Sequence, residues 1–549
     1  MRNKNKRVSN LGTRFCGFFD KVLIVLIISL IVLFILWPVI AVISKSLFLN
    51  GKFTLDLYKN IFTNNKKLIY NSLFVATITT IISTVFSIVI STYVYFSNNR
   101  TKKILMLILM LTMISPPFVS SLAYIQLFGR RGFITYKILK LNINPYGWQG
   151  IVSMQSLGFI SLNSLMILGF IKNINKSLLQ SSRDLGASVL YTFRRVLLPL
   201  MAPSIIVCSL LTFIRSLSDF GTPMTIGGAF NTLATEIYLK IIAQGDLSMA
   251  AAMNILILVP TILIFIPYRM YMKTANNTYN EKVTSNTIDF KFKGIVLIIF
   301  RIITYLFVVV MIFQYSTIFL SAITKFSYGK TSFTFEYIKY LKEYNASSIV
   351  RSIIYGLITG IIGTFIGMII SYYMERRKIR GRKIIDFIVT IPYIIPGTFF
   401  GIGYILAFNS KPLALTGTAF IVVLNCIFKQ LPMVTKTTSA SLSQINREME
   451  YSAKDLGANK FYILKDMIFP NVKSAFIVGF INNFTATMTT LGAVIFLIYP
   501  GQKVATIDLF EAINGGNYGV AGAISSIIII ITLLINISFS KVVLRNEEY

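Results

Sequence analysis

Polar side chains that stand inside otherwise apolar stretches are the places where this sequence could do chemistry. They fall into two groups, which lie at equivalent places on the fifth and the eleventh apolar run: Arg215, Ser218 and Asp219, and Asn482, Asn483 and Thr485. The chain has no histidine and only three widely spaced cysteines. Histidine-based triads, a zinc site and a disulfide framework are therefore excluded. These residue types suit the binding or passage of a solute better than catalysis.

Each group has a functional and a structural interpretation. Intramembrane polar residues are by default candidates for a translocation path. Arg215 and Asp219 are four residues apart, so they can also simply pair on one helix face. Asn482, Asn483 and Thr485 can hydrogen-bond a solute or hold neighbouring helices together. The sequence leaves both interpretations open.

The composition places these residues in a membrane protein. Of the 549 residues, 55% are hydrophobic and only 13% are charged, whereas soluble domains carry about 25% charged residues. The mean hydropathy is +0.70. The net charge of +33 comes mostly from loops between apolar runs, a pattern that orients a membrane protein beside anionic lipid. No nucleic-acid partner is expected.

Twelve apolar runs are long enough to span a bilayer, and in lipid such runs must be helical. The first run is longer than the core of a signal peptide, so we expect it to be retained. The predicted spans are 22–43, 72–96, 104–128, 150–171, 202–220, 250–272, 294–323, 349–374, 384–408, 414–434, 474–498 and 519–540.

The distribution of basic residues predicts the orientation. With the N-terminus in the cytoplasm, the inside segments hold about twice as many Lys and Arg residues as the outside segments. The runs RTKK (100–103) and ERRKIRGRK (375–383) are the clearest inside markers. The sequence thus predicts a multi-pass protein with both termini in the cytoplasm.

The two halves of the chain resemble each other. NSLFVATITTIIST, from Asn71, is similar to RSIIYGLITGIIGT, from Arg351, at an offset of 280 residues. We predict an all-α membrane protein in which twelve transmembrane helices form two parallel six-helix repeats. The predicted parts are a first half (1–272), a polar cytoplasmic linker (273–293) and a second half (294–549).

The strongest signal is a motif repeated in the loops after the fourth and tenth spans. Asp-Leu-Gly-Ala occurs in both, and a proline follows each Asp by 15 residues. The glycine permits a left-handed turn between two short helices, so we expect a helix–Gly–helix elbow in each half. Two elbows predict a cytoplasmic partner with two grooves. The repeated residues are Asp184, Leu185, Gly186, Ala187 and Pro199 in the first copy, and Asp455, Leu456, Gly457, Ala458 and Pro470 in the second.

These loops resemble the E-A-A-x-x-x-G-A pattern of permease subunits of binding-protein-dependent ABC importers with the type I fold. Both Gly-Ala pairs and both prolines match that pattern, and Phe193 matches its aromatic residue. Gln180 and Tyr451 stand where the family has its Glu, although Glu450 is adjacent to Tyr451. The length of the chain and the segment DFGTPMTIGG (219–228) are similar to the fused, ferric-iron branch of the family.

The resemblance implies two cytoplasmic ATPase subunits and an extracytoplasmic solute-binding protein as partners, in a bacterial inner membrane. It implies that the repeated motif residues contact the ATPase subunits. The chain has no G-x-x-x-x-G-K-[ST] loop, so it should bind no cofactor and catalyse no reaction, and ATP would be used by the partner. Solute would pass by alternating access of the two halves.

Ferric iron is the solute that the resemblance favours. Permeases for phosphonates, polyamines and other small solutes are similar enough to remain alternatives. A secondary transporter driven by an ion gradient would need acidic relay residues deep in the spans, and Asp219 is almost alone there. A membrane-bound enzyme would need a cluster of His, Asp or Glu at a membrane face, and none is visible in the sequence.

Overall fold

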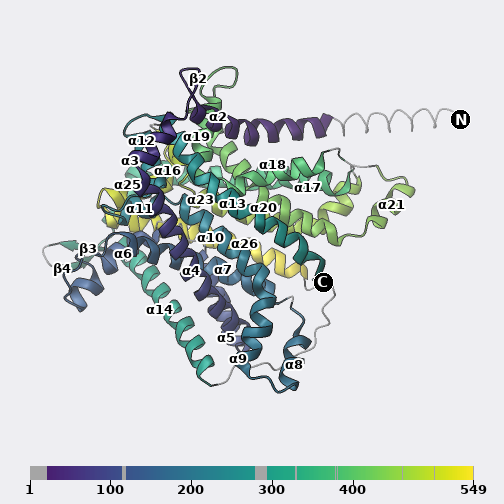
Figure 1. The fold of residues 1–549 in the computed structure, drawn as a ribbon, viewed down its shortest axis with the longest axis horizontal. Helices are drawn as coiled ribbons and strands as arrows, with labels where there is room; N and C mark the ends of the chain where they lie inside the picture. Colours follow the sequence, from purple (N-terminus) through teal and green to yellow (C-terminus); the bar gives the residue numbers. More distant parts are fainter. Residues whose placement is uncertain are drawn as a thin grey trace. The chain divides into compact units, whose positions relative to one another are not determined.

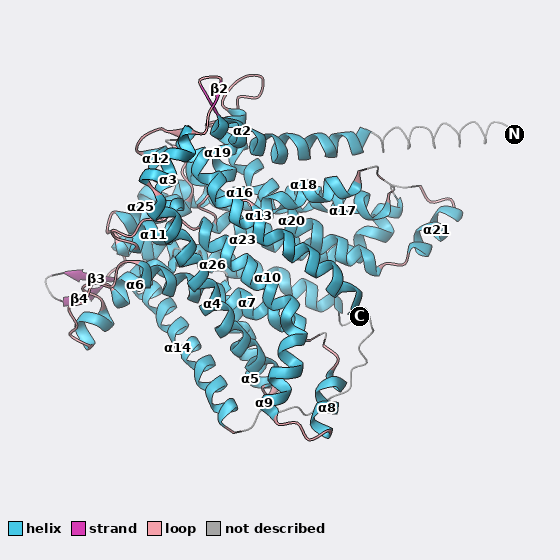
Figure 2. Ribbon diagram, in the orientation of Figure 1, coloured by secondary structure: helices cyan, strands magenta, loops and turns pink. Residues whose placement is uncertain are grey.

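The structure, a computed structural model, is built almost entirely of helices, with two short β-hairpins (Figures 1 and 2). Apolar runs bounded by basic loops form the long helices, as expected for segments whose backbone groups must be satisfied internally. The described residues are 22–113, 119–172, 174–278, 294–327, 330–377, 379, 381–459, 462–499 and 501–547.

Nine described helices are long and apolar enough to cross a membrane. A tenth candidate is the pair Arg382–Ile394 and Gly397–Phe408, which is bent by 114° at Ile395–Pro396. The remaining two of the twelve predicted spans are 104–128, which includes residues outside the described part, and 474–498, so the count of twelve stays a prediction. The nine helices are Val22–Leu47, Lys66–Phe96, Trp148–Ile171, Val189–Ser218, Leu247–Pro267, Ile295–Ile323, Glu336–Arg376, Ala419–Gln444 and Tyr518–Phe539.

The helices group into two compact units, and neither unit is a continuous stretch of chain. The larger unit, called here the 46–347 unit, combines residues 46–347 with 505–530. Its elements, with η for a π-helical segment, are β1 (Phe48–Leu49), β2 (Lys52–Phe53), α3 (Asp56–Asn64), α4 (Lys66–Phe96), α5 (Asn99–Met113), α6 (Val119–Phe128), η2 (Phe133–Ile138), α7 (Trp148–Ile171), α8 (Lys176–Asp184), α9 (Val189–Thr192), η3 (Phe193–Leu197), α10 (Leu198–Ser218), α11 (Gly221–Ile226), α12 (Leu233–Ile242), α13 (Leu247–Thr278), α14 (Ile295–Ile323), β3 (Thr324–Ser327), β4 (Lys330–Phe333), α15 (Glu336–Tyr340), η4 (Leu341–Asn345) and α25 (Ala505–Asn514).

The other unit, called here the 348–504 unit, also includes the first helix of the chain and the end of the last one. Its interior is rich in fully buried aromatic side chains, among them Tyr404 and Phe484. Its elements are η1 (Val32–Leu36), α2 (Trp37–Leu47), α16 (Ala346–Ile358), η5 (Thr359–Gly363), α17 (Thr364–Arg376), α18 (Arg382–Ile394), α19 (Gly397–Phe408), α20 (Ala419–Gln444), α21 (Arg447–Asp455), η6 (Ile463–Ile468), α23 (Phe469–Thr489), α24 (Val494–Leu497) and the second part of α26 (Tyr518–Glu547).

Each unit includes the first long helix of the other half of the sequence. In the 348–504 unit, the Tyr404 hydroxyl donates to the carbonyl of Phe34 at 2.8 Å, and the rings of Phe34 and Phe428 stack with centroids 4.9 Å apart. In the 46–347 unit, Gln314 of α14 donates to the Ser120 hydroxyl at 2.6 Å. The boundaries predicted at 272 and 294 describe the sequence repeat, and their role as folding boundaries stays a prediction.

The order of elements repeats along the chain. A β-hairpin and a short helix precede α4 in the first half and α16 in the second. Two pairs of later helices correspond residue for residue at the offset of 271: α8 matches α21, and α10 matches α23. The predicted elbows therefore occupy corresponding places in two copies of one arrangement.

Candidate functional site

Each elbow begins with a short helix capped by asparagine. The Asn175 side chain accepts a hydrogen bond from the backbone N–H of Ser177 at the start of α8. The Asn446 side chain does the same for Glu448 at the start of α21. Asparagine is among the best N-cap residues because its side-chain oxygen satisfies an otherwise unpaired backbone donor. The N-terminus of each helix is therefore stabilised by the same kind of cap.

Both short helices end in the same glycine-based turn. Gly186 has φ of +83° and Gly457 has φ of +86°. In the first elbow Gly186 N–H donates to Arg183 O at 2.9 Å, and Ala187 N–H donates to Ser182 O at 3.1 Å. The second elbow has the same two bonds, from Gly457 N–H to Lys454 O and from Ala458 N–H to Ala453 O. This pair of bonds is the Schellman motif, so the predicted left-handed turn is confirmed in both copies.

The chain then turns into the next long helix without a break. Ser188 caps α9 by accepting from Tyr191 N–H at 3.2 Å, and η3 leads directly into α10. Because a proline usually limits a helix, the sequence predicts that the helix ends at Pro199 before the span, and this prediction is wrong. Pro199 is the second residue of α10 and follows the π-helical segment η3 inside one helix that runs from Val189 to Ser218. The π-helical segment already interrupts the regular hydrogen-bond ladder at this point. Pro470 occupies the same place in α23.

One apolar side chain projects from the tip of each elbow. Leu185 and Leu456 are each 88% exposed, although a leucine in water gains nothing from exposure. Beside Leu185 lies a hollow of about 730 Å³. It is lined by Leu178, Ser181, Ser182, Leu185, Gly186, Ala187, Ser188, Tyr191 and Val196. The tip of the first elbow thus combines a protruding apolar residue with an adjacent depression.

The second elbow also has a buried ion pair that the sequence analysis did not predict. Glu450 of α21 lies 3.1 Å from the Nε atom of Arg376 at the end of α17, and the two side chains are 9% and 4% exposed. The sequence showed Glu450 next to the position of the family's Glu. It gave no sign of Arg376, which is 74 residues away in the chain.

Asp219 lies in a hydrogen-bonded network within the 46–347 unit. Its carboxylate accepts from Gln155 Nε2 at 2.9 Å and from the backbone N–H of Thr222 at 3.2 Å. The side-chain oxygen of Gln155, Oε1, accepts in turn from the hydroxyls of Ser216 and Thr79. The expected Arg215–Asp219 pair is not among the ion pairs of the described residues, and the Arg215 side chain is exposed.

The second polar group lies within the 348–504 unit. Asn483 is fully buried and donates to the Thr364 hydroxyl at 3.2 Å. Thr485 accepts a hydrogen bond from Asn536 of α26 at 3.1 Å. The Nδ2 atom of Asn482 is buried without a hydrogen-bond partner, as is the Oδ1 atom of Asn483. Ser218 of the first group donates to Ile214 O of its own helix.

None of the described residues forms a group of three or more His, Cys, Asp or Glu side chains that could hold a metal ion. The network around Asp219 offers one carboxylate, and the group around Asn483 offers amides and hydroxyls. Such donors suit brief contact with a passing solute better than tight chelation.

The long helices of the described residues recur in a similar order, and each half of the chain has one elbow. The sequence matches the family of the binding-protein-dependent transport system inner membrane component over residues 83–277 and 363–544. The chain belongs to this family, as an ABC importer permease in which two permease domains are fused. This confirms the predicted family and the internal repeat.

Several permeases of known sequence are similar to the chain. The ferric transport system permease protein FbpB of Actinobacillus pleuropneumoniae is 29% identical over 95% of this chain and 79% of its own length. A putative ferric transport system permease protein FbpB 1 of Haemophilus influenzae is 28% identical, over 88% and 78%. A putative 2-aminoethylphosphonate transport system permease protein PhnV of Salmonella paratyphi A is 23% identical, over 36% and 75%.

Proposed function

We propose that this chain is the permease of an ATP-driven importer for ferric iron. The observation that carries the proposal is the similarity to ferric transport permeases over 95% of the chain, which includes both elbows. The similarity to a phosphonate permease extends over 36% of the chain, so a phosphonate is the second candidate solute. Family membership favours an ATP-driven cycle over one driven by an ion gradient.

In this proposal the two elbows dock two cytoplasmic ATPase subunits, one for each half. The exposed Leu185 and Leu456 enter the grooves of the ATPase subunits. Asp184, Ala187, Asp455 and Ala458 surround them on the elbow surface. Gly186 and Gly457 give the turns their shape, while Pro199 and Pro470 join each elbow to its span. The support is that the same turn is built twice from equivalent hydrogen bonds.

The chain itself binds no cofactor, and the partner subunits bind and hydrolyse ATP. Both termini and the elbows lie in the cytoplasm, as the distribution of Lys and Arg indicates. A solute-binding protein delivers iron at the opposite face. ATP binding draws the elbows together, the two halves open outward to accept iron, and hydrolysis returns them to the inward state.

Arg215, Ser218, Asp219, Asn482, Asn483 and Thr485 are proposed to face the translocation path during this cycle. The support comes from Asp219, a single acidic group whose carboxylate accepts hydrogen bonds from the Gln155 side chain of α7 and from the Thr222 backbone of α11. A carboxylate is a hard oxygen donor that suits ferric iron. One carboxylate binds weakly enough to release it.

The test is uptake of labelled ferric iron by a strain in which the gene is deleted and other iron importers are removed. We expect uptake to fall to background and to return with the intact gene. A Gly186→Asp plus Gly457→Asp variant should fail to restore it. Restored uptake of 2-aminoethylphosphonate with unchanged iron uptake would replace the ferric assignment with the phosphonate one.

A further inference from the structure

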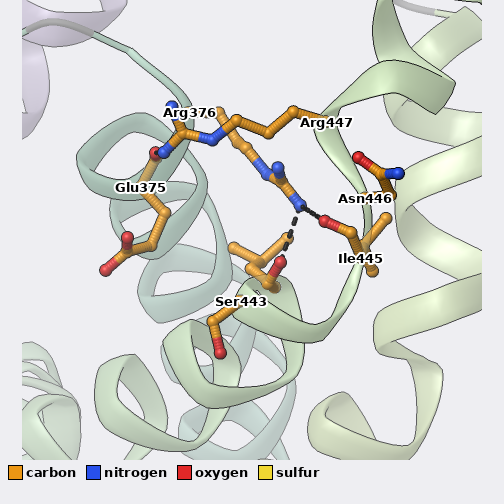
Figure 3. Close-up of a pocket in the computed structure, with 7 residues that line it drawn as sticks. Glu375, Arg376, Ser443, Ile445, Asn446 and Arg447 are labelled. Carbon is orange, nitrogen blue, oxygen red and sulfur yellow. Dashed lines mark hydrogen bonds between the residues drawn. The ribbon is translucent and has the colours of Figure 1, made fainter.

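The second elbow helix is joined to the membrane helices by a single buried guanidinium. Arg376 is the last residue of α17, and its Nε atom lies 3.1 Å from Glu450 on α21. Its Nη2 atom donates to the carbonyls of Leu442 at 2.6 Å and Ile445 at 2.8 Å. Figure 3 shows both of these bonds at the end of α20. One side chain therefore links α17, α20 and the elbow helix α21.

Neighbouring charges reinforce this junction. Arg447, the first residue of α21, donates to the backbone carbonyl of Glu375 at 3.0 Å. The Glu375 carboxylate pairs with Arg382 at the start of α18 at 2.7 Å. A cavity of about 410 Å³ lies among these residues and the end of α20. The last two residues of α17 thus hold three other helices by side-chain or backbone polar contacts.

At the corresponding junction in the first half, apolar residues occupy the positions of Arg376 and Glu450. The offset of 280 places Phe96, the last residue of α4, at the position of Arg376, and the offset of 271 places Leu179 at the position of Glu450. Leu179 is 2% exposed and belongs to an apolar cluster against which Phe96 packs. The two halves therefore attach equivalent elbow helices to equivalent membrane helices by different chemistry.

We propose that Arg376 and Glu450 are positioning residues that transmit the movement of the second elbow to α17 and α20. This inference rests on the proposed docking of an ATPase subunit to α21. Because a buried charge cannot be left without its partner, the ion pair keeps α21 and α17 together while the elbow moves. In the first half the burial of Leu179 performs the same task.

The experiment uses the full-length chain co-expressed with its ATPase subunits and reconstituted in proteoliposomes together with the solute-binding protein. Iron uptake per ATP hydrolysed is measured for Glu450→Gln and for the double variant Arg376→Phe plus Glu450→Leu. The double variant copies the first half. Replacing a buried ion pair by a well-packed apolar pair is often tolerated, whereas removing one partner is not. We expect Glu450→Gln to lower the ratio at least tenfold and the double variant to stay within about threefold of the wild type.

Lys436→Gln is the matched control. Lys436 pairs with Asp386 at 2.6 Å in the same unit, but this pair joins α18 to α20 and does not involve α21. Its loss should leave the ratio unchanged. A wild-type ratio in Glu450→Gln, or an equal fall in Lys436→Gln, would overturn the proposal. If Glu450→Gln does not fold, the double variant decides, and a tenfold loss in it counts against the proposal.

A second measurement separates this inference from the proposed function. Spin labels are placed at Gln444, on α20, and at Lys454, on α21, and their distance distribution is recorded with and without ATP. We expect a narrow distribution in the wild type and in the double variant, and a broad one in Glu450→Gln. An unchanged distribution in Glu450→Gln would overturn the positioning role whatever the solute. Failure of the ATPase subunits to co-purify with the wild type would instead overturn the proposed function, and this inference with it.

Discussion

The side-chain amide of Gln155 donates a hydrogen bond to the carboxylate of Asp219, with 2.9 Å between the two atoms. The amide cannot turn over easily, because its oxygen accepts from the Ser216 and Thr79 hydroxyls at 2.5 and 3.3 Å. Helices α4, α7 and α10 therefore contribute to one network that aims a donor at a single carboxylate. A buried network of this kind fixes the orientation of the acid.

This network leads to a prediction for Asp219→Asn and Gln155→Leu. If the carboxylate contacts the solute, Asp219→Asn should lower iron uptake at least tenfold without changing ATPase binding. Gln155→Leu removes a hydrogen bond to a charged group, which costs about 1.5–3 kcal/mol, so it should lower thermal stability as well as uptake. Uptake in proteoliposomes and unfolding in detergent measure the two effects.

Thr317→Val serves as the control for those variants. The Thr317 hydroxyl donates to Phe313 O of its own helix at 2.7 Å and contacts no other element through that bond. Its loss should leave uptake unchanged. Wild-type uptake in Asp219→Asn would remove Asp219 from the proposed path and leave it as a purely structural residue.

The elbow glycines should show a graded response to substitution. A Cβ atom at Gly186 or Gly457 would meet nothing within 4 Å, so the cost lies in the left-handed backbone alone. That cost is about 1–2 kcal/mol for an ordinary residue and less for asparagine. Affinity for the ATPase subunit, measured by titration in nanodiscs, should fall in the order Gly, Asn, Ala. Equal affinities for the Asn and Ala variants would show that the turn does not control docking.

The exposed leucines of the elbows should carry the apolar part of docking. Burying a leucine contributes about 1.5–3 kcal/mol, so Leu185→Asp or Leu456→Asp should weaken ATPase binding by about ten- to a hundredfold. Because both side chains are exposed, thermal unfolding of the permease alone should not change. Leu141→Asp, at an exposed site on the predicted outer side, is the control and should bind normally. Equal weakening by Leu141→Asp would indicate a general effect of charge.

The elbows were predictable because the information that forms them is local. The glycine sets its turn within a few residues, so two copies of one pattern were enough to predict both turns. The possible ion pair between Arg215 and Asp219 is not formed, and the reason is local too. Helix α10 ends at Ser218, and Asp219 has extended backbone angles, so the four-residue spacing no longer places the two side chains on one helix face.

The residues that do contact Asp219 and Glu450 come from distant parts of the chain. Gln155 is 64 residues from Asp219, and Arg376 is 74 residues from Glu450. Spacing along a sequence does not reveal which helices become neighbours. The packing of each unit around the first helix of the other half was missed for the same reason, since hydropathy shows that a helix spans the membrane but not what it packs against.

Close packing between α17 and α20 supports a last prediction, about stability. A Cβ atom at Gly367 would lie 2.5 Å from Cγ1 of Val434, so Gly367→Ala should force the helices apart and lower the free energy of unfolding by about 1–3 kcal/mol. Gly158 in α7 has nothing within 4 Å of the same position, and Gly158→Ala should stabilise by about 0.5–1 kcal/mol. Adding Val434→Ala to Gly367→Ala removes the methyl group that the new Cβ atom would meet, so it should recover part of the lost free energy of unfolding. Unfolding in nanodiscs measures all four proteins, and a Gly367→Ala variant as stable as Gly158→Ala would contradict this close approach of α17 to α20.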